Sequence, residues 1–197
     1  MKYDLPENVE EEEEEQPAEE ELAPVDPEEA KDMPARELKR WGLSRIEHMS
    51  IEVSAGNGRE VHLEEVTGAT ILPSWYVRQE FGVPPERVKR VKVVGDSMVP
   101  ILRPGQHIYI VLLTGTEAIS NGVIYVLDGP EGLMIKRLYL DAEIVTSGGN
   151  GEAKEDVRRY VRIWSENEAA GRYRVPLDVF ERDYRLIAYL AKAEVAL

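Results

Sequence analysis

Short runs in which apolar and polar residues alternate recur along most of the chain. Met49, Ile51 and Val53 alternate with polar residues, and so do Val91 and Val93. A repeat of two residues is typical of β-strands that bury one face. Such segments, together with short apolar runs, predict strands over residues 49–54, 59–64, 88–94, 108–113, 123–127, 133–140, 144–146, 160–164 and 184–191.

Turn signals separate these segments. Asn57-Gly58 and Pro104-Gly105 are typical of tight turns. Residues 74–81, which follow Pro73, predict one short helix, and residues 36–48 predict an irregular lead-in with weak helical character. Many short strands with few helices predict a mainly β fold of antiparallel sheets, arranged as a barrel or a sandwich.

Charge divides the 197-residue chain into two parts. Residues 1–34 hold 15 acidic and two basic residues, whereas residues 35–197 hold 23 acidic and 22 basic ones. The first part contains six consecutive glutamates and five prolines, so it cannot bury enough apolar area to fold. We therefore predict a disordered acidic N-terminal arm and lead-in over residues 1–48, followed by one domain over residues 49–197.

The residue types in the chain exclude several kinds of catalytic and metal-binding site. The chain has no cysteine, which excludes disulfides, thiolate metal sites and cysteine nucleophiles. His48, His62 and His107 lie in different predicted segments, and neither metal-binding nor nucleotide-binding motifs occur, so no metal or cofactor is expected. No apolar run reaches 18 residues and the N-terminus is acidic, so we expect a cytoplasmic protein without a membrane span. The acidic arm and the near-neutral domain predict no direct DNA binding by this chain alone.

One segment has the pattern of a serine nucleophile. After the strand predicted over residues 88–94, Gly95-Asp96 forms a tight turn that presents Ser97, and Pro100 restricts the backbone beyond it. Backbone N–H groups near such a turn can point to one position, so a nucleophile and an oxyanion hole are built together. The alternative is an ordinary turn in which Asp96 or Ser97 bonds its own backbone.

A serine nucleophile needs a base, and Lys136 is the candidate. In the strand predicted over residues 133–140, Lys136 shares a face with Met134, Leu138 and Leu140. Burial among apolar residues lowers the pKa of a lysine, and a neutral amine can take the proton from a serine. The alternative is a lysine that extends from an edge strand into water.

These two segments together resemble the LexA/UmuD family of self-cleaving Ser–Lys peptidases, which includes the C-terminal domains of phage repressors. The resemblance covers about residues 49–191. It rests first on two motifs, Gly95-Asp96-Ser97-Met98-x-Pro100-x-Leu102-x-x-Gly105 and Ile135-Lys136-Arg137-Leu138, and Lys136 lies 39 residues after Ser97. Two further segments also match, Val53-Ser54-Ala55-Gly56 and Trp164-Ser165-Glu166-Asn167 with Tyr173. It implies a β-clip fold like that of signal peptidases, a homodimer, and a role in transcriptional repression or the DNA-damage response.

The resemblance also implies a role for each matching residue. Ser97 would be the nucleophile, Lys136 the general base, and the backbone N–H groups of Ser97 and Met98 the oxyanion donors. The Ala55–Gly56 peptide would be the bond that the chain cuts in itself, with the tether supplying a high effective concentration. The alternative for this segment is a glycine-rich hairpin turn.

The chain departs from the family at two points. Full repressors carry an N-terminal helix-turn-helix domain, whereas here only 48 residues, most of them in the acidic arm, precede the first predicted strand. Gln106 follows Gly105 where the family has aspartate, and we expect this difference to affect the turn rather than catalysis. The related signal peptidases share the Ser–Lys chemistry but act at a membrane, for which we expect no anchor here.

The sequence therefore predicts a regulatory Ser–Lys autopeptidase that cuts itself at Ala55–Gly56. We expect a homodimer in which the apolar strand over residues 184–191 pairs. A protein activator of cleavage, or a protein partner for the acidic arm, is also expected. The alternative is a catalytically silent dimerisation module of the same fold whose acidic arm binds a protein.

Overall fold

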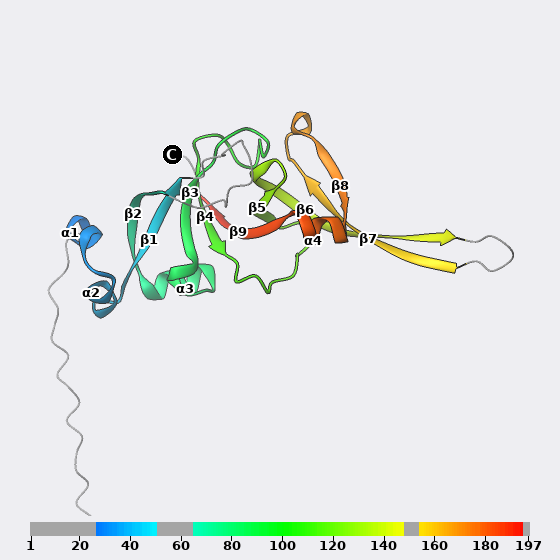
Figure 1. Ribbon diagram of the computed structural model, residues 1–197. Helices are drawn as coiled ribbons and strands as arrows, with labels where there is room; N and C mark the ends of the chain where they lie inside the picture. The colour runs from blue at the N-terminus through cyan, green and yellow to red at the C-terminus, as the bar shows by residue number, and fades with distance from the viewer. Residues whose placement is uncertain (1–26, 51–64, 148–153, 195–197) are drawn as a thin grey trace, which may run out of the picture.

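The centre of the molecule is one open, mixed sheet of nine strands, in the order β2-β1-β3-β4-β9-β5-β6-β7-β8 (Figure 1). This computed structural model describes residues 27–50, 65–147 and 154–194. The strands are β1 (Leu43–Ser50), β2 (Glu65–Pro73), β3 (Val88–Lys92), β4 (His107–Leu112), β5 (Ile124–Gly129), β6 (Gly132–Ser147), β7 (Lys154–Trp164), β8 (Arg172–Pro176) and β9 (Arg185–Ala193).

Short helices lie at the margins of this sheet. They are α1 (Pro27–Asp32), α2 (Ala35–Arg40), α3 (Ser74–Phe81) and α4 (Leu177–Asp183), with 3-10 turns at Pro85–Arg87 and Glu168–Ala170. The mainly β prediction and the helix predicted over residues 74–81 are confirmed. No helix in the described part of the chain is long and apolar enough to cross a membrane.

The sheet differs from the expected arrangement in two ways. Among the described residues β2 and β8 each pair with one strand only, so the sheet is open and the predicted barrel or sandwich is wrong. The pairing of β1 with β3 is parallel, through His48 with Arg90 and Met49 with Val91, whereas the other neighbouring strands are antiparallel.

The first strand begins at Leu43, six residues before the start predicted at Met49, so the lead-in is wrong over residues 43–48, whereas α2 confirms its weak helical character over residues 36–40. Strand β1 is an interior strand, and two of its polar side chains have partners on the neighbouring strands. Glu47 accepts a bond of 2.6 Å from Lys89 on β3, and His48 Nε2 lies 2.7 Å from Thr70 Oγ1 on β2. Because polar residues can be paired in this way inside the sheet, β1 lacks the alternation of apolar and polar residues by which a half-exposed strand is predicted.

Strands β6 and β7 are longer than predicted and form a hairpin. Strand β6 has 16 residues and joins the two strands predicted over residues 133–140 and 144–146, and β7 has 11 residues. Beyond Arg137 on β6 and Tyr160 on β7, neighbouring strands no longer pair with them, and the two strands continue away from the body of the molecule as a ribbon (Figure 1). We call residues 138–147 and 154–161 the hairpin extension, and at its base Tyr160 and Val161 still pair with β8.

Three apolar clusters hold the body together. The first joins β3, β4, β5 and β9 to the loop after β3, through Met98 and Leu102. The second packs β5, β6, β7 and β8 against Phe180 of α4, and the third packs α3 against β1, β3 and β4. The loop that carries Ser97 therefore rests on the first cluster, and β6 contributes to both of the first two.

Some predicted features lie outside the described residues. These are most of the acidic arm (residues 1–26), the turn at Asn57-Gly58, the strand predicted over residues 59–64, and the cleavage segment Ala55–Gly56. The division into residues 1–48 and 49–197 stays a prediction.

Candidate functional site

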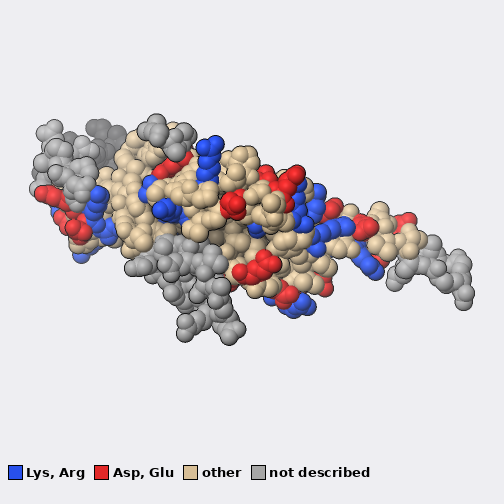
Figure 2. All heavy atoms as spheres, turned by 90° about the horizontal axis from the view of Figure 1, so that it is seen from above, with Lys and Arg blue, Asp and Glu red and all other residues tan. Residues whose placement is uncertain are grey.

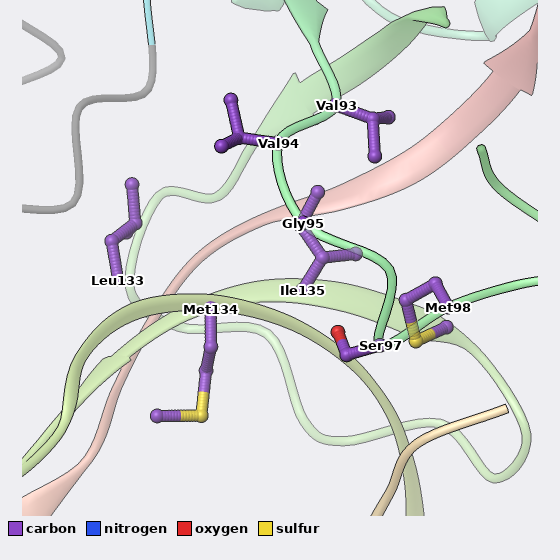
Figure 3. Close-up of a pocket in the computed structure, with 8 residues that line it drawn as sticks. All are labelled: Val93, Val94, Gly95, Ser97, Met98, Leu133, Met134 and Ile135. Carbon is purple, nitrogen blue, oxygen red and sulfur yellow. The ribbon is translucent and has the colours of Figure 1, made fainter. Parts of the chain in front are cut away.

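A cavity of about 120 Å³ opens beside Ser97. The loop after β3 supplies one wall, and β6 supplies the other (Figure 3). Its lining is apolar apart from the serine, and consists of Val93, Val94, Gly95, Ser97, Met98, Leu133, Met134 and Ile135. A cavity of this size holds a few small groups, so it suits small residues better than bulky ones.

The loop that carries Ser97 is fixed at both ends. Val93 N donates to Gln106 O over 2.8 Å, and Gly105 N donates to Val93 O over 2.9 Å, which closes the base of the loop. The Gln106 side chain accepts a bond from Arg103 N (3.0 Å) and donates to Glu194 O (2.8 Å). The residue that differs from the family pattern thus supports the turn, as expected.

Ser97 itself is half buried, and its neighbour Met98 is buried in the first apolar cluster. Gly95 has a φ of 79°, a left-handed conformation that glycine adopts without steric cost. Within the described residues, the backbone N–H groups of Ser97 and Met98 have no hydrogen-bond acceptor, and neither does the Ser97 hydroxyl. Two adjacent free N–H groups beside a serine can stabilise a developing oxyanion.

Lys136 is buried, as its place in an apolar row predicted. Its exposed fraction is 8%, and its Nζ donates to Ser165 Oγ over 2.8 Å. Lys136 and Ser165, the latter 0% exposed, are the two buried polar side chains of the described part of the chain. Burial lowers the pKa of Lys136, and the charge of the exposed Glu131 opposes this effect less strongly. The alternative of a lysine that extends into water is therefore wrong.

The segment after β7 connects the two candidate residues. Asn167 N donates to Ser97 O over 3.0 Å, and the Asn167 side chain donates to Asp96 O over 3.3 Å. Two residues earlier, Ser165 accepts the bond from Lys136 and its hydroxyl donates to Ala170 O (3.3 Å). Ser97 and Lys136 thus lie against the two ends of one three-residue segment.

The structure does not join Ser97 and Lys136 directly. Among the described residues no hydrogen bond links Ser97 Oγ with Lys136 Nζ. Catalytic hydrogen bonds are often long in a free enzyme and tighten only when substrate is bound. An ammonium has three N–H donors, so the bond to Ser165 leaves Nζ able to face Ser97 as well.

Ser165 is the residue whose role the sequence did not reveal. It stood in a stretch that resembled the family, but nothing in the sequence marked it as the partner of the lysine. The signal was a polar residue directly after the apolar end of β7, and only the packing of β7 against β6 brings it to Lys136.

The histidines lie elsewhere. His48 on β1 and His107 on β4 both neighbour β3, so they are closer together than their separate predicted segments indicated. Burial lowers the pKa of His48, and neither residue lines the cavity beside Ser97. His62 lies outside the described residues. Among the described residues no group of three or more acidic or histidine side chains could hold a metal ion.

Comparison with known proteins adds one match. Residues 47–146 match the family model described as Peptidase S24-like. The matched range contains Ser97 and Lys136, and it also spans Ala55–Gly56. No curated protein matches the chain.

Proposed function

Since the chain belongs to the Peptidase S24-like family, we propose that it is a Ser–Lys autopeptidase in which Ser97 is the nucleophile and Lys136 is the general base. The observation that carries this proposal is the burial of Lys136 with a hydroxyl, rather than a carboxylate, as its hydrogen-bond partner. A buried carboxylate would hold the lysine in its charged form. A hydroxyl carries no charge to oppose the effect of burial, so the pKa of Lys136 stays below its ordinary value, which favours the neutral amine.

The proposed reaction uses Ser97 and Met98, which line the cavity, and Lys136, which follows the lining residue Ile135 on β6. Neutral Lys136 Nζ takes the proton from Ser97 Oγ as that oxygen attacks the carbonyl carbon of the scissile peptide. The backbone N–H groups of Ser97 and Met98 bind the oxyanion. The Lys136 ammonium then protonates the departing amine, and an acyl ester remains on Ser97. Water, deprotonated by Lys136, hydrolyses the ester and restores the serine hydroxyl.

The proposed substrate is the Ala55–Gly56 peptide of the same chain. Strands β1 and β3 are parallel, and Met49 pairs with Val91. Ala55 and Ser97 each lie six residues beyond this pair. Six residues span at most about 20 Å, so a segment that leaves β1 starts within reach of the serine. The small side chains of Ala55 and Gly56 suit the small cavity.

The resemblance to LexA and UmuD supports a regulatory purpose for this cleavage. We propose a role in transcriptional repression or in the response to DNA damage. A separate protein would trigger the reaction. Alkaline pH would have the same effect without that protein, because it removes the proton from Lys136. This trigger and the link to DNA damage rest on the resemblance alone.

Intact-mass measurement of the full chain after incubation at about pH 7 and about pH 10 tests the proposal. The wild type should yield fragments 1–55 and 56–197, faster at the higher pH. Ser97→Ala and Lys136→Ala should stay intact, whereas the matched controls Ser120→Ala and Lys92→Ala, at exposed sites, should cut like the wild type.

Two results would overturn the proposal. A Lys136→Ala chain that still cuts at Ala55–Gly56 would exclude the lysine as the base. A wild-type chain that stays intact at alkaline pH would favour the alternative, a silent interaction module of the same fold.

A further inference from the structure

The segment that follows β9 lies beside the base of the loop that carries Ser97. Glu194, the first residue after β9, donates from its backbone N to His107 O over 3.0 Å. Its backbone O accepts a bond of 2.8 Å from the Gln106 side chain. Gln106 also accepts the bond from Val93 N that closes the base of the loop. The C-terminal end of the described chain is therefore joined to the point where this loop returns to the sheet.

The Gln106 side chain extends this connection into the loop itself. Its Nε2 makes the bond to the segment after β9, while its Oε1 accepts a bond of 3.0 Å from Arg103 N. Between Ser97 and Arg103 the backbone forms a compact turn, in which Leu102 N donates to Met98 O over 2.9 Å. The Leu102 side chain is fully buried in the first apolar cluster. A shift of Arg103 N is therefore transmitted toward Met98, whose N–H is a proposed oxyanion donor.

A two-point ion pair fixes the position of Glu194. Arg90 on β3 donates from Nε and from Nη2 to the two carboxylate oxygens, over 2.8 and 2.7 Å. The side chains of Arg90 and Glu194 are only 18% and 32% exposed. Acidic and basic side chains lie close to one another over the face seen in Figure 2, and a fully exposed ion pair of this kind usually stabilises little. A two-point bond between partly buried groups is stronger and also fixes their geometry.

We propose that Glu194 is a positioning residue for Ser97, whose loop it holds through Gln106. This inference rests on the proposed function and adds the segment after β9 to the parts of the chain that control the rate of self-cleavage. Glu194 does not line the cavity, so it acts only through the loop that carries the nucleophile and the oxyanion donors. Small displacements of reacting groups cost large factors in rate.

A glutamine at residue 106 is what makes this link possible. An amide both accepts and donates hydrogen bonds, whereas an ionised carboxylate only accepts them. An aspartate or glutamate at this position could accept the bond from Arg103 N but could not donate to Glu194 O. The departure of Gln106 from the family pattern therefore creates the link between the segment after β9 and the loop.

The link should be equally strong at neutral and at alkaline pH. The bond from Arg90 lowers the pKa of Glu194, and the same contact raises the pKa of Arg90. Both groups therefore stay charged between about pH 7 and about pH 10. A substitution at Glu194 should slow self-cleavage by the same factor throughout this range.

Self-cleavage of the full chain, followed by intact mass at several pH values, is the first test. Glu194→Ala and Gln106→Glu should each slow the cut about tenfold without moving the midpoint of the pH–rate profile, because neither contacts Lys136. The double variant should be no slower than Gln106→Glu alone, since the link is already broken, whereas two independent structural defects would multiply. Glu47→Ala is the matched control, because it removes an ion pair with Lys89 of the same strand β3 at similar exposure, 16% and 36%. It should cut within about twofold of the wild type.

Amide hydrogen exchange in the Ser97→Ala chain tests the link without any activity. Glu194→Ala should speed exchange at the N–H groups of Arg103 and Leu102 at least about fivefold. It should leave the N–H of Leu138, which bonds to Val123 O, unchanged, because a general loss of stability would speed all protected amides together.

Unchanged exchange at Arg103 and Leu102, or a double variant slower than both single variants, overturns the positioning role. A wild-type chain that does not cut itself overturns the proposed function instead, and the exchange measurement then decides alone whether Glu194 holds the loop. Circular dichroism confirms that each variant is folded.

Discussion

At the scale of single residues, Lys136 and Ser165 form a buried pair that costs stability. Burying an ammonium without a carboxylate is unfavourable, and one hydroxyl compensates only part of the lost hydration. The same burial lowers the pKa of Lys136, which is the property that a general base requires. Stability and the proposed chemistry therefore oppose each other at this position.

We expect Lys136→Met to raise the free energy of unfolding by about 1 kcal/mol at neutral pH, which is about 2–4 °C in Tm. Because folding lowers the pKa of Lys136, the folded chain binds fewer protons than the unfolded chain between the lowered pKa and 10.5. The wild type therefore gains stability as pH rises through this window, and the advantage of the variant shrinks. Thermal unfolding at several pH values, in a Ser97→Ala background, measures this difference.

The exposed Lys92→Met is the control for this substitution and should change Tm little at any pH. An advantage of Lys136→Met that grows toward alkaline pH would contradict the burial argument.

Ser165 is a positioning residue in the proposed reaction, because it holds the amine without facing the substrate. Ser165→Ala should slow self-cleavage about 10- to 100-fold, since Nζ loses the partner that orients it. The lost hydroxyl also accepts a bond from the ammonium, so its removal disfavours the charged form and lowers the pKa of Lys136 further. The midpoint of the pH–rate profile should move to lower pH, whereas a purely structural defect would lower the rate at every pH without moving the midpoint.

Ser165→Thr keeps the hydroxyl and should recover part of the rate. Equal rates and equal pH midpoints for Ser165→Ala and the wild type would show that Ser165 does not position the lysine.

At the scale of elements, the β5–β6 turn depends on a glycine that faces an aromatic ring. A Cβ at Gly129 would lie 2.6 Å from two ring carbons of Tyr184, closer than packed atoms approach. Tyr184 follows α4 and stacks on Phe180 with ring centres 4.9 Å apart. The close contact between β5 and the end of α4 therefore requires glycine at residue 129.

We expect Gly129→Ala to lower the free energy of unfolding by about 1–3 kcal/mol, because the Tyr184 ring must move away from its stack. In a Tyr184→Ala background the same substitution should cost much less, since the clash is absent. Chemical denaturation of the four chains of this double-mutant cycle measures the difference. Equal costs in the two backgrounds would show that backbone conformation, rather than the ring, restricts residue 129.

At the scale of the whole molecule, charge is concentrated at one end of the chain. Residues 1–26 carry a net charge of −11, and removing them would leave −3. In the rest of the chain basic side chains are largely offset by acidic ones, as in the ion pairs of Arg90 with Glu194 and Arg137 with Glu166. Such a surface has no net attraction for a polyanion.

We therefore expect no specific binding of duplex DNA, with any Kd weaker than about 100 µM at low salt. Fluorescence anisotropy with labelled duplexes measures this. A chain without residues 1–26 is the matched control, because it separates masking by the acidic arm from a domain that lacks a DNA-binding surface. Nanomolar, salt-sensitive binding by either chain would contradict the expectation.

Local patterns in the sequence were sufficient for several conclusions. The mainly β fold, the helix at Ser74–Phe81 and the burial of Lys136 in an apolar row were predicted correctly. Each depends on residues a few positions apart in the chain, whose spacing indicates where a turn occurs and which side chains share one face of a strand or helix. The family resemblance was also readable from the sequence, because two short segments carry it, and the family match bears it out.

The tertiary structure decided which distant segments meet. It placed β1 parallel to β3, put β9 inside the sheet, joined two predicted strands into β6, and brought Ser165 to Lys136. The sequence pattern missed these features because strand pairing and buried hydrogen bonds join residues far apart in the chain. A polar residue such as Glu47 can lie on an interior strand because it bonds to a residue far away in the chain. The alternation of apolar and polar residues, which marks a half-buried strand in the sequence, is therefore absent from such an interior strand.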